Sequence, residues 1–180
     1  MGSGYIVQEI LGCQVKYQEN GNPWVLPRVL SEAEVWELEV PEDIEGTPSM
    51  RTLLALMASL EAEYGYLQGD VPLHSVLNVA IDLRGQDYFI DLIENRPLVE
   101  HLHRVIARTI YEVGRRVKAR TGVVAISVNR IIAGFDPSIF TIPNCSLQMI
   151  SPDIKPEGAL GAEFRTKWDL SVLEGSLFYG

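Results

Sequence analysis

The clearest hydrophobic pattern in the chain predicts a long amphipathic helix that begins at Arg96 and Pro97. Basic residues gather toward the end of this segment, where positive charge suits the helix dipole, and Gly122 is suited to end the helix. The apolar positions recur with the i, i+3, i+4, i+7 spacing that places side chains on one helix face: Leu98, Leu102, Val105, Ile106, Ile110, Val113 and Val117.

Local start and stop signals predict three further helices. A capping box, in which a Ser and a Glu three residues later satisfy free backbone N–H groups, opens one of them. A Thr-Pro pair opens another, which Gly65 or Gly69 ends. The predicted helices begin at Ser31-x-x-Glu34, at Thr47-Pro48 and at Asp87, and the third ends near Glu94.

Apolar and β-branched runs predict strands. Residues 76–81 and 123–128 read as two buried strands, and 145–150 as a third. The long helix lies between the first two, which favours a parallel strand–helix–strand unit and an α/β fold. Near the N-terminus, residues 5–11 and 13–17 are β-prone runs, followed by a turn cluster.

Composition predicts one globular domain that spans residues 1–180. The chain is 47% hydrophobic and 22% charged, which excludes disordered and low-complexity classes. The net charge of −9 argues against nucleic-acid binding, which needs clustered Lys and Arg. Neither a run of about 18 apolar residues nor a signal peptide is found, so we expect no membrane partner and a cytoplasmic location.

Candidate site residues follow the predicted strands, because ligands bind at the carboxyl ends of parallel strands. Asp82 and Arg84 follow the first predicted strand, and Asn129 and Arg130 follow the second. An arginine offers a forked donor for carboxylate or phosphate. The alternative for Asp82 and Arg84 is a local ion pair or loop cap, and for Arg130 a salt bridge at the rim.

Cysteine and histidine give weaker signals. Cys13 and Cys145 read as small buried residues rather than nucleophiles or ligands. His101 and His103 stand two apart on a helix, so they face different directions and cannot form an i, i+4 metal pair. His74 precedes a predicted strand, at the wrong end for a barrel active site. Common metal, phosphate-loop, dinucleotide and serine-hydrolase motifs are absent.

Six short segments, taken in order, resemble the middle of proteins of the uroporphyrinogen decarboxylase-like superfamily. This superfamily includes uroporphyrinogen decarboxylases and cobalamin-dependent methyltransferases of the methylcobamide:coenzyme M type. The resemblance covers about residues 10–154 and implies a TIM barrel with a ligand site at the carboxyl ends of its strands. The segments are LGCQV (11–15), NPWV (22–25), LNVAIDLRGQDYF (77–89), DLIENRP (91–97), SVNR (127–130) and NCSLQMISP (144–152).

The sequence departs from this family in length and in ligands. A whole barrel needs about 250 residues, so we expect a partial barrel that lacks its first and last strands. Zinc and a corrinoid partner are implied by the family alone. The family's His-x-Cys zinc pair has no counterpart at Leu177-Phe178-Tyr179-Gly180, and the decarboxylase signature is absent. Exposed sheet edges of a partial barrel would favour a homo-oligomer.

These observations leave three functions open. The resemblance favours the corrinoid-dependent methyltransferase branch, with Asp82 as acid/base or acceptor, Arg84 and Arg130 as anion clamps and Asn129 as a polar anchor. A second alternative is a non-catalytic binding module with the same partial barrel, and a third is a decarboxylase of tetrapyrrole biosynthesis. A further interpretation is that the chain is an α/β domain whose resemblance to this family is accidental. Whether the chain is catalytic stays open at this point.

Overall fold

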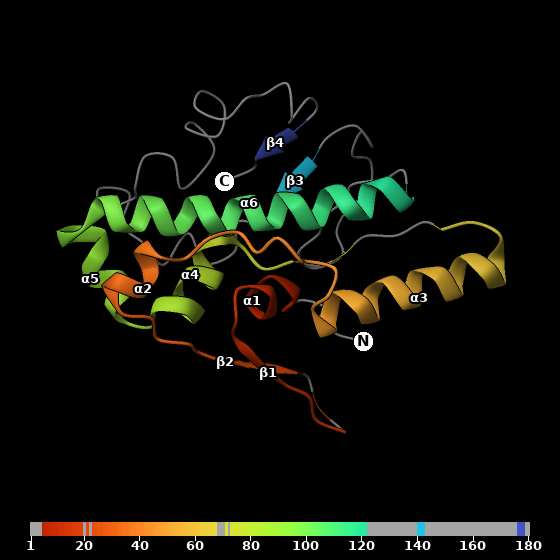
Figure 1. The fold of residues 1–180 in the computed structure, drawn as a ribbon, viewed down its shortest axis with the longest axis horizontal. Coiled ribbons are helices and arrows are strands. Elements are labelled where there is room, and N and C mark those ends of the chain that lie inside the picture. Colours follow the sequence, from red (N-terminus) through yellow and green to blue (C-terminus); the bar gives the residue numbers. More distant parts are fainter. Residues whose placement is uncertain are drawn as a thin grey trace.

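The computed structural model describes residues 5–19, 21, 23–67, 71 and 73–121, together with two short strands at 140–142 and 176–178. One long helix, α6 (Arg96–Thr121), crosses the molecule and anchors the described part. Four shorter helices pack along one side of it (Figure 1): α1 (Ile6–Ile10), α2 (Glu32–Trp36), α4 (Val76–Arg84) and α5 (Asp87–Glu94). The core of the described part is therefore helical, with one long helix as its common wall.

Helix α6 confirms the predicted amphipathic pattern. Every apolar position named for it from the sequence is buried, and Ile106, Ile110 and Val113 are completely inaccessible to solvent. At 26 residues, α6 is about 39 Å long, at a rise of 1.5 Å per residue. A helix of this length can hold four shorter helices at successive turns of one apolar face.

The N-terminal segment begins with a helix rather than the predicted strand at 5–11. Helix α1 (Ile6–Ile10) buries Ile6, Val7, Gln8 and Ile10, so nearly its whole surface lies in the core. An apolar run of this length does not by itself distinguish a buried strand from a buried helix turn. The adjacent β-prone run does form a strand, β1 (Gln14–Lys16), which pairs antiparallel with β2 (Trp24–Leu26) across the predicted turn.

The predicted start signals are confirmed in full for α2 and in part for α3 (Pro48–Tyr64), where the Thr47 hydroxyl donates to the Ile44 carbonyl instead of capping the helix. Helix α2 (Glu32–Trp36) starts with a complete capping box between Ser31 and Glu34. Helix α3 (Pro48–Tyr64) starts with Pro at its first position, and Gly65 ends it in the left-handed conformation that glycine adopts without strain. Helix α3 extends away from the other helices in Figure 1.

The strand predicted at 76–81 is wrong, because these residues form helix α4 (Val76–Arg84). Four buried side chains follow the i, i+3, i+4, i+7 spacing of a helix face: Val76, Val79, Ala80 and Leu83. The spacing becomes visible only when the sequence is read past residue 81, where the apolar run ends. Ser75 caps the helix by accepting from the Asn78 N–H, and α5 (Asp87–Glu94) follows after two residues, as predicted.

The strand–helix–strand unit built on that strand is therefore also wrong. Residues 123–128 and 145–150, the other predicted strands, lie outside the described part. Two short strands after α6 are described. These are β3 (Phe140–Ile142) and β4 (Ser176–Phe178), and they pair parallel with each other. The described residues thus combine helices with two two-stranded sheets, and the expected barrel is not among them.

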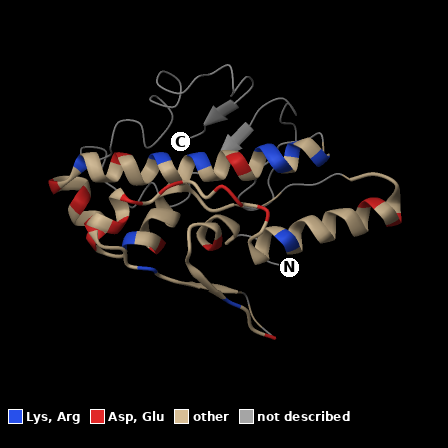
Figure 2. Cartoon of the chain, in the orientation of Figure 1, with Lys and Arg blue, Asp and Glu red and all other residues tan. Residues whose placement is uncertain are grey.

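Charge is distributed unevenly over the described residues. The acidic segment between α2 and α3, residues 37–47, runs beside α6 (Figure 2). Glu45 pairs there with Arg116 at 3.5 Å and Arg120 at 3.9 Å, so the acidic segment is held to the basic end of α6. Within the described residues, every helix is too short or too polar to cross a bilayer.

Candidate functional site

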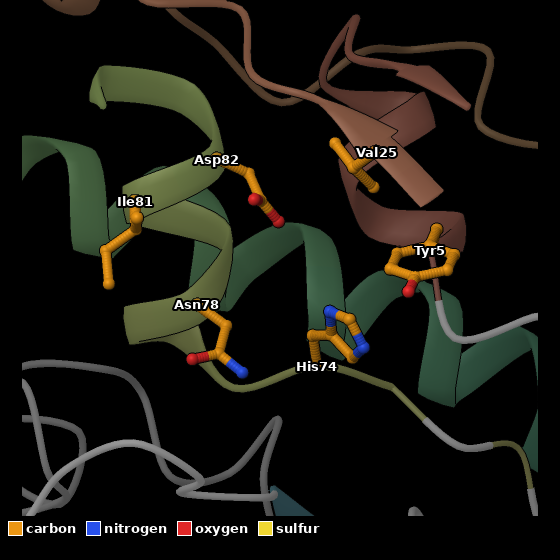
Figure 3. Close-up of a pocket in the computed structure, with 6 residues that line it drawn as sticks. All are labelled: Tyr5, Val25, His74, Asn78, Ile81 and Asp82. Carbon is orange, nitrogen blue, oxygen red and sulfur yellow. The ribbon is translucent and has the colours of Figure 1, made fainter. Parts of the chain in front are cut away.

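A pocket of about 270 Å³ opens between α1, β2 and α4. Asp82 and Asn78 project into it from α4, while Tyr5 and Val25 face them from the opposite side (Figure 3). His74, just before α4, lies between the two walls, and Ile81 completes the described lining. The pocket thus combines a carboxylate, an imidazole, an amide and a phenol with two aliphatic side chains.

The helical form of residues 76–84 places two of these polar groups on one wall. Asn78 and Asp82 are four residues apart, so they lie one turn above the other on the same face of α4. Ser75 starts the helix directly after His74, which places the imidazole at the base of that face. A strand would have placed Asn78 and Asp82 on one face too, but more extended and without this cap.

A buried glutamine joins the carboxylate to the imidazole. Gln8, on α1, is completely inaccessible to solvent, and its Nε2 lies 3.1 Å from Asp82 Oδ2 and 2.7 Å from His74 Nδ1. An amide NH₂ only donates, so His74 Nδ1 is the acceptor and the neutral ring carries its hydrogen on Nε2. Gln8 therefore fixes both the tautomer of His74 and the position of Asp82.

The backbone after β2 holds the end of α4 against this site. The Arg28 N–H donates to the Asp82 carbonyl at 2.8 Å, and the Leu30 N–H donates to the Leu83 carbonyl at 2.8 Å. Between them, Val29 has φ of 51°, a strained conformation for a β-branched residue. The two bonds satisfy carbonyls at the end of α4 that have no partner within the helix.

Burial shifts both titrating groups toward their neutral forms. Desolvation raises the pKa of Asp82 above its ordinary value, although the Gln8 hydrogen bond and the nearby His74 oppose this. Desolvation also lowers the pKa of His74, against the opposing effect of Asp82. At neutral pH the site therefore holds a neutral imidazole beside a carboxylate that is more basic than an exposed aspartate.

The candidate residues from the sequence have different positions. Asp82 lines the pocket as described. Arg84 is buried and directed elsewhere: its Nε donates to Asp91 Oδ2 at 2.7 Å, and its Nη1 to the Leu30 carbonyl at 2.6 Å. These are the bonds of the local ion pair that the sequence left as an alternative. Asn129 and Arg130 lie outside the described residues, so their roles stay predictions.

Sequence reasoning missed the residues that surround Asp82. His74 precedes a predicted strand, which places it at the wrong end for a barrel site, and Gln8, Tyr5 and Asn78 are not among the candidate residues. The i, i+4 spacing of Asn78 and Asp82 would have linked those two once the helix was recognised. Gln8 is 66 positions from His74, and nothing in the local sequence signals that contact.

The buried thiol next to this site is unsuited to nucleophilic chemistry. Burial, the largest effect, raises the pKa of Cys13 to about 12, so the thiol stays protonated at neutral pH. This agrees with the interpretation of Cys13 as a small buried residue. Cys145 lies outside the described residues.

Metal ligands for the zinc that the family resemblance implies do not come together in the described part. Among those residues, no three His, Cys, Asp or Glu side chains are grouped so that they could hold a metal ion. A corrinoid macrocycle also exceeds a pocket of about 270 Å³, which is below the usual size of drug-sized ligand sites. At this volume, the described pocket fits a small molecule.

Comparisons with known proteins support the fold alone. No family model matches the sequence, and no curated protein matches it. Among solved structures, the chain is similar to a methyltransferase from Methanosarcina mazei, with a TM-score of 0.65 and 17% sequence identity. The likeness covers 97% of this chain but 47% of the other, so the chain spans about half the length of that methyltransferase.

Proposed function

We propose that this chain is a methyltransferase-like protein whose pocket between α1 and α4 binds the small molecule that takes up the methyl group. The fold likeness to a methyltransferase over 97% of the chain carries this proposal. The corrinoid-dependent branch is the finer part of the proposal and rests on the ordered segments that resemble that branch. The pocket supplies the second support, because its polar side chains converge on one small space.

In the proposed reaction, Asp82 is the base. Methyl transfer to a thiol or a similar acceptor makes a new bond from the acceptor atom to carbon and breaks the bond from carbon to the donor. The donor keeps that electron pair, and the acceptor's proton must leave. Asp82 can take this proton, because burial makes its carboxylate more basic, and neutral His74 can hold the acceptor through its Nε2–H.

The test is methyl transfer in solution from methylcobalamin to 2-mercaptoethanol, followed by loss of the cobalt–carbon absorbance and by mass analysis of the methylated thiol. Transfer above the protein-free rate, lost in Asp82→Asn and kept in Asp87→Asn, is the expected result. The control Asp87→Asn removes the same charge from the exposed start of α5. A wild-type rate equal to the protein-free rate would contradict the proposal.

The non-catalytic alternative makes a different prediction for the same sample. If the chain only binds, 2-mercaptoethanol would shift the NMR signals of the His74 imidazole, and the methylated thiol would not form.

Self-association stays a prediction from the expected partial barrel, and light scattering tests it. A dimer or larger species supports it, and a monomer with a cooperative melt counts against it.

A further inference from the structure

Asp82 is a half-buried carboxylate that receives one neutral hydrogen bond in the described part of the chain. Its Oδ2 accepts from Gln8 Nε2 at 3.1 Å, and the salt bridges found among the described residues do not include it. Arg84, two residues along α4, is turned to Asp91 instead. A carboxylate that is partly removed from water gains stability from a positive charge or from further donors, and the described residues supply one donor.

The rest of the described lining offers a cation a suitable environment. His74 is neutral and lies between Asp82 and Tyr5, whose ring meets the imidazole edge-on with the centroids 4.7 Å apart. Val25 supplies an aliphatic side chain on the wall opposite α4 (Figure 3), and Ile81 is the other aliphatic residue of the lining. A single negative charge beside apolar and aromatic surface is the arrangement that favours a small organic cation over an anion.

We infer that the pocket selects a small molecule with a positively charged N–H donor on a short aliphatic body, with the ammonium group against Asp82. This inference rests on the proposed function, because it names the class of molecule that would occupy the same pocket, and the proton that Asp82 takes would then be one of the ammonium protons. It also excludes a class: a sulfonate or carboxylate head group facing Asp82 would meet a like charge.

Three probes of nearly equal size separate charge from shape: propylammonium, 1-propanol and propionate. Binding is followed by the NMR signals of the His74 ring, assigned with a His74→Gln variant among the three histidines of the chain. Propylammonium is expected to bind about fivefold to tenfold more tightly than propionate, with 1-propanol between them. Asp82→Asn should remove this order, while Asp87→Asn should keep it.

The outcome separates this inference from the proposed function. Propionate binding as tightly as propylammonium, or no response of His74 to any probe, would overturn the inference. An unchanged order of affinity in Asp82→Asn would also overturn it, because another group would then be the source of the selectivity. Methyl transfer is measured separately, so its absence contradicts the proposed function and leaves the binding order to stand on its own.

Discussion

Gln8 Nε2 and His74 Nδ1 lie 2.7 Å apart although 66 positions separate the two residues in the chain. This contact joins α1 to His74, the residue of the pocket lining that precedes α4. The same amide nitrogen reaches Asp82, so a single buried side chain orders both titrating groups of the candidate site.

Replacing Gln8 with Leu should lower the stability of the protein and change the pKa of Asp82, because His74 and Asp82 both lose their hydrogen-bond donor. The variant removes the donor from two acceptors, so the free energy of unfolding should fall by about 1–3 kcal/mol. The pKa of Asp82 should rise further, because the Gln8 hydrogen bond now lowers it. Denaturant unfolding and an NMR titration of the Asp82 carboxyl carbon measure these effects. The control is Gln14→Leu on an exposed strand position, which should leave both values unchanged.

Arg84 and Asp91 should act as a structural pair. Arg84→Ala leaves a buried carboxylate without its partner, so we expect a loss of about 3–5 kcal/mol in unfolding free energy. Arg115→Ala, which breaks an exposed pair with Glu112, should cost at most about 1 kcal/mol. If Arg84→Ala instead kept full stability and lost ligand binding, Arg84 would be the anion clamp that the sequence suggested.

His103 should make stability fall in mild acid. Burial lowers the pKa of His103 to about 4, and its Nε2 lies 2.8 Å from the Tyr88 hydroxyl. The unfolded chain binds the proton near the ordinary value of about 6.5. Stability contributed by the neutral ring is therefore complete above pH 6.5 and is lost as the pH falls toward 4, by about 3 kcal/mol in total.

The difference between wild type and His103→Leu isolates this group from the other titrating residues. Unfolding free energies measured from pH 7 to pH 4 should fall more steeply in wild type than in the variant. His101→Leu, the same substitution on the same helix, serves as the control for the change of side chain. Parallel curves for wild type and His103→Leu would show that His103 is not the group responsible.

Cys13 should resist alkylation in the folded protein. Since burial raises its pKa to about 12, the thiolate fraction at pH 8 is about one in ten thousand, and the side chain is also inaccessible. In a Cys145→Ser variant, Cys13 is the one remaining thiol. Iodoacetamide should label it in denaturant and leave it unlabelled in buffer, as mass spectrometry would show. Rapid labelling in buffer would disprove the assigned burial.

The sequence predicted elements with strong local signals and failed where tertiary contacts decide. The capping box at Ser31 and the long periodicity of α6 are local, and both are confirmed. Residues 76–81 form an apolar run compatible with a buried strand or a buried helix, and burial against α1 and α6 accompanies the helix. The site itself depends on Gln8 meeting His74 and Asp82, a long-range contact without a local pattern.

The pH dependence of methyl transfer tests the central claim most directly, because it reports the ionisation of Asp82 in the working pocket. With methylcobalamin and 2-mercaptoethanol, the rate in wild type should rise as Asp82 loses its proton through its raised pKa. Asp82→Asn should be slower by about a hundredfold or more and should lack that rise. Identical pH profiles and rates for the two proteins would contradict the assignment of Asp82 and of this pocket.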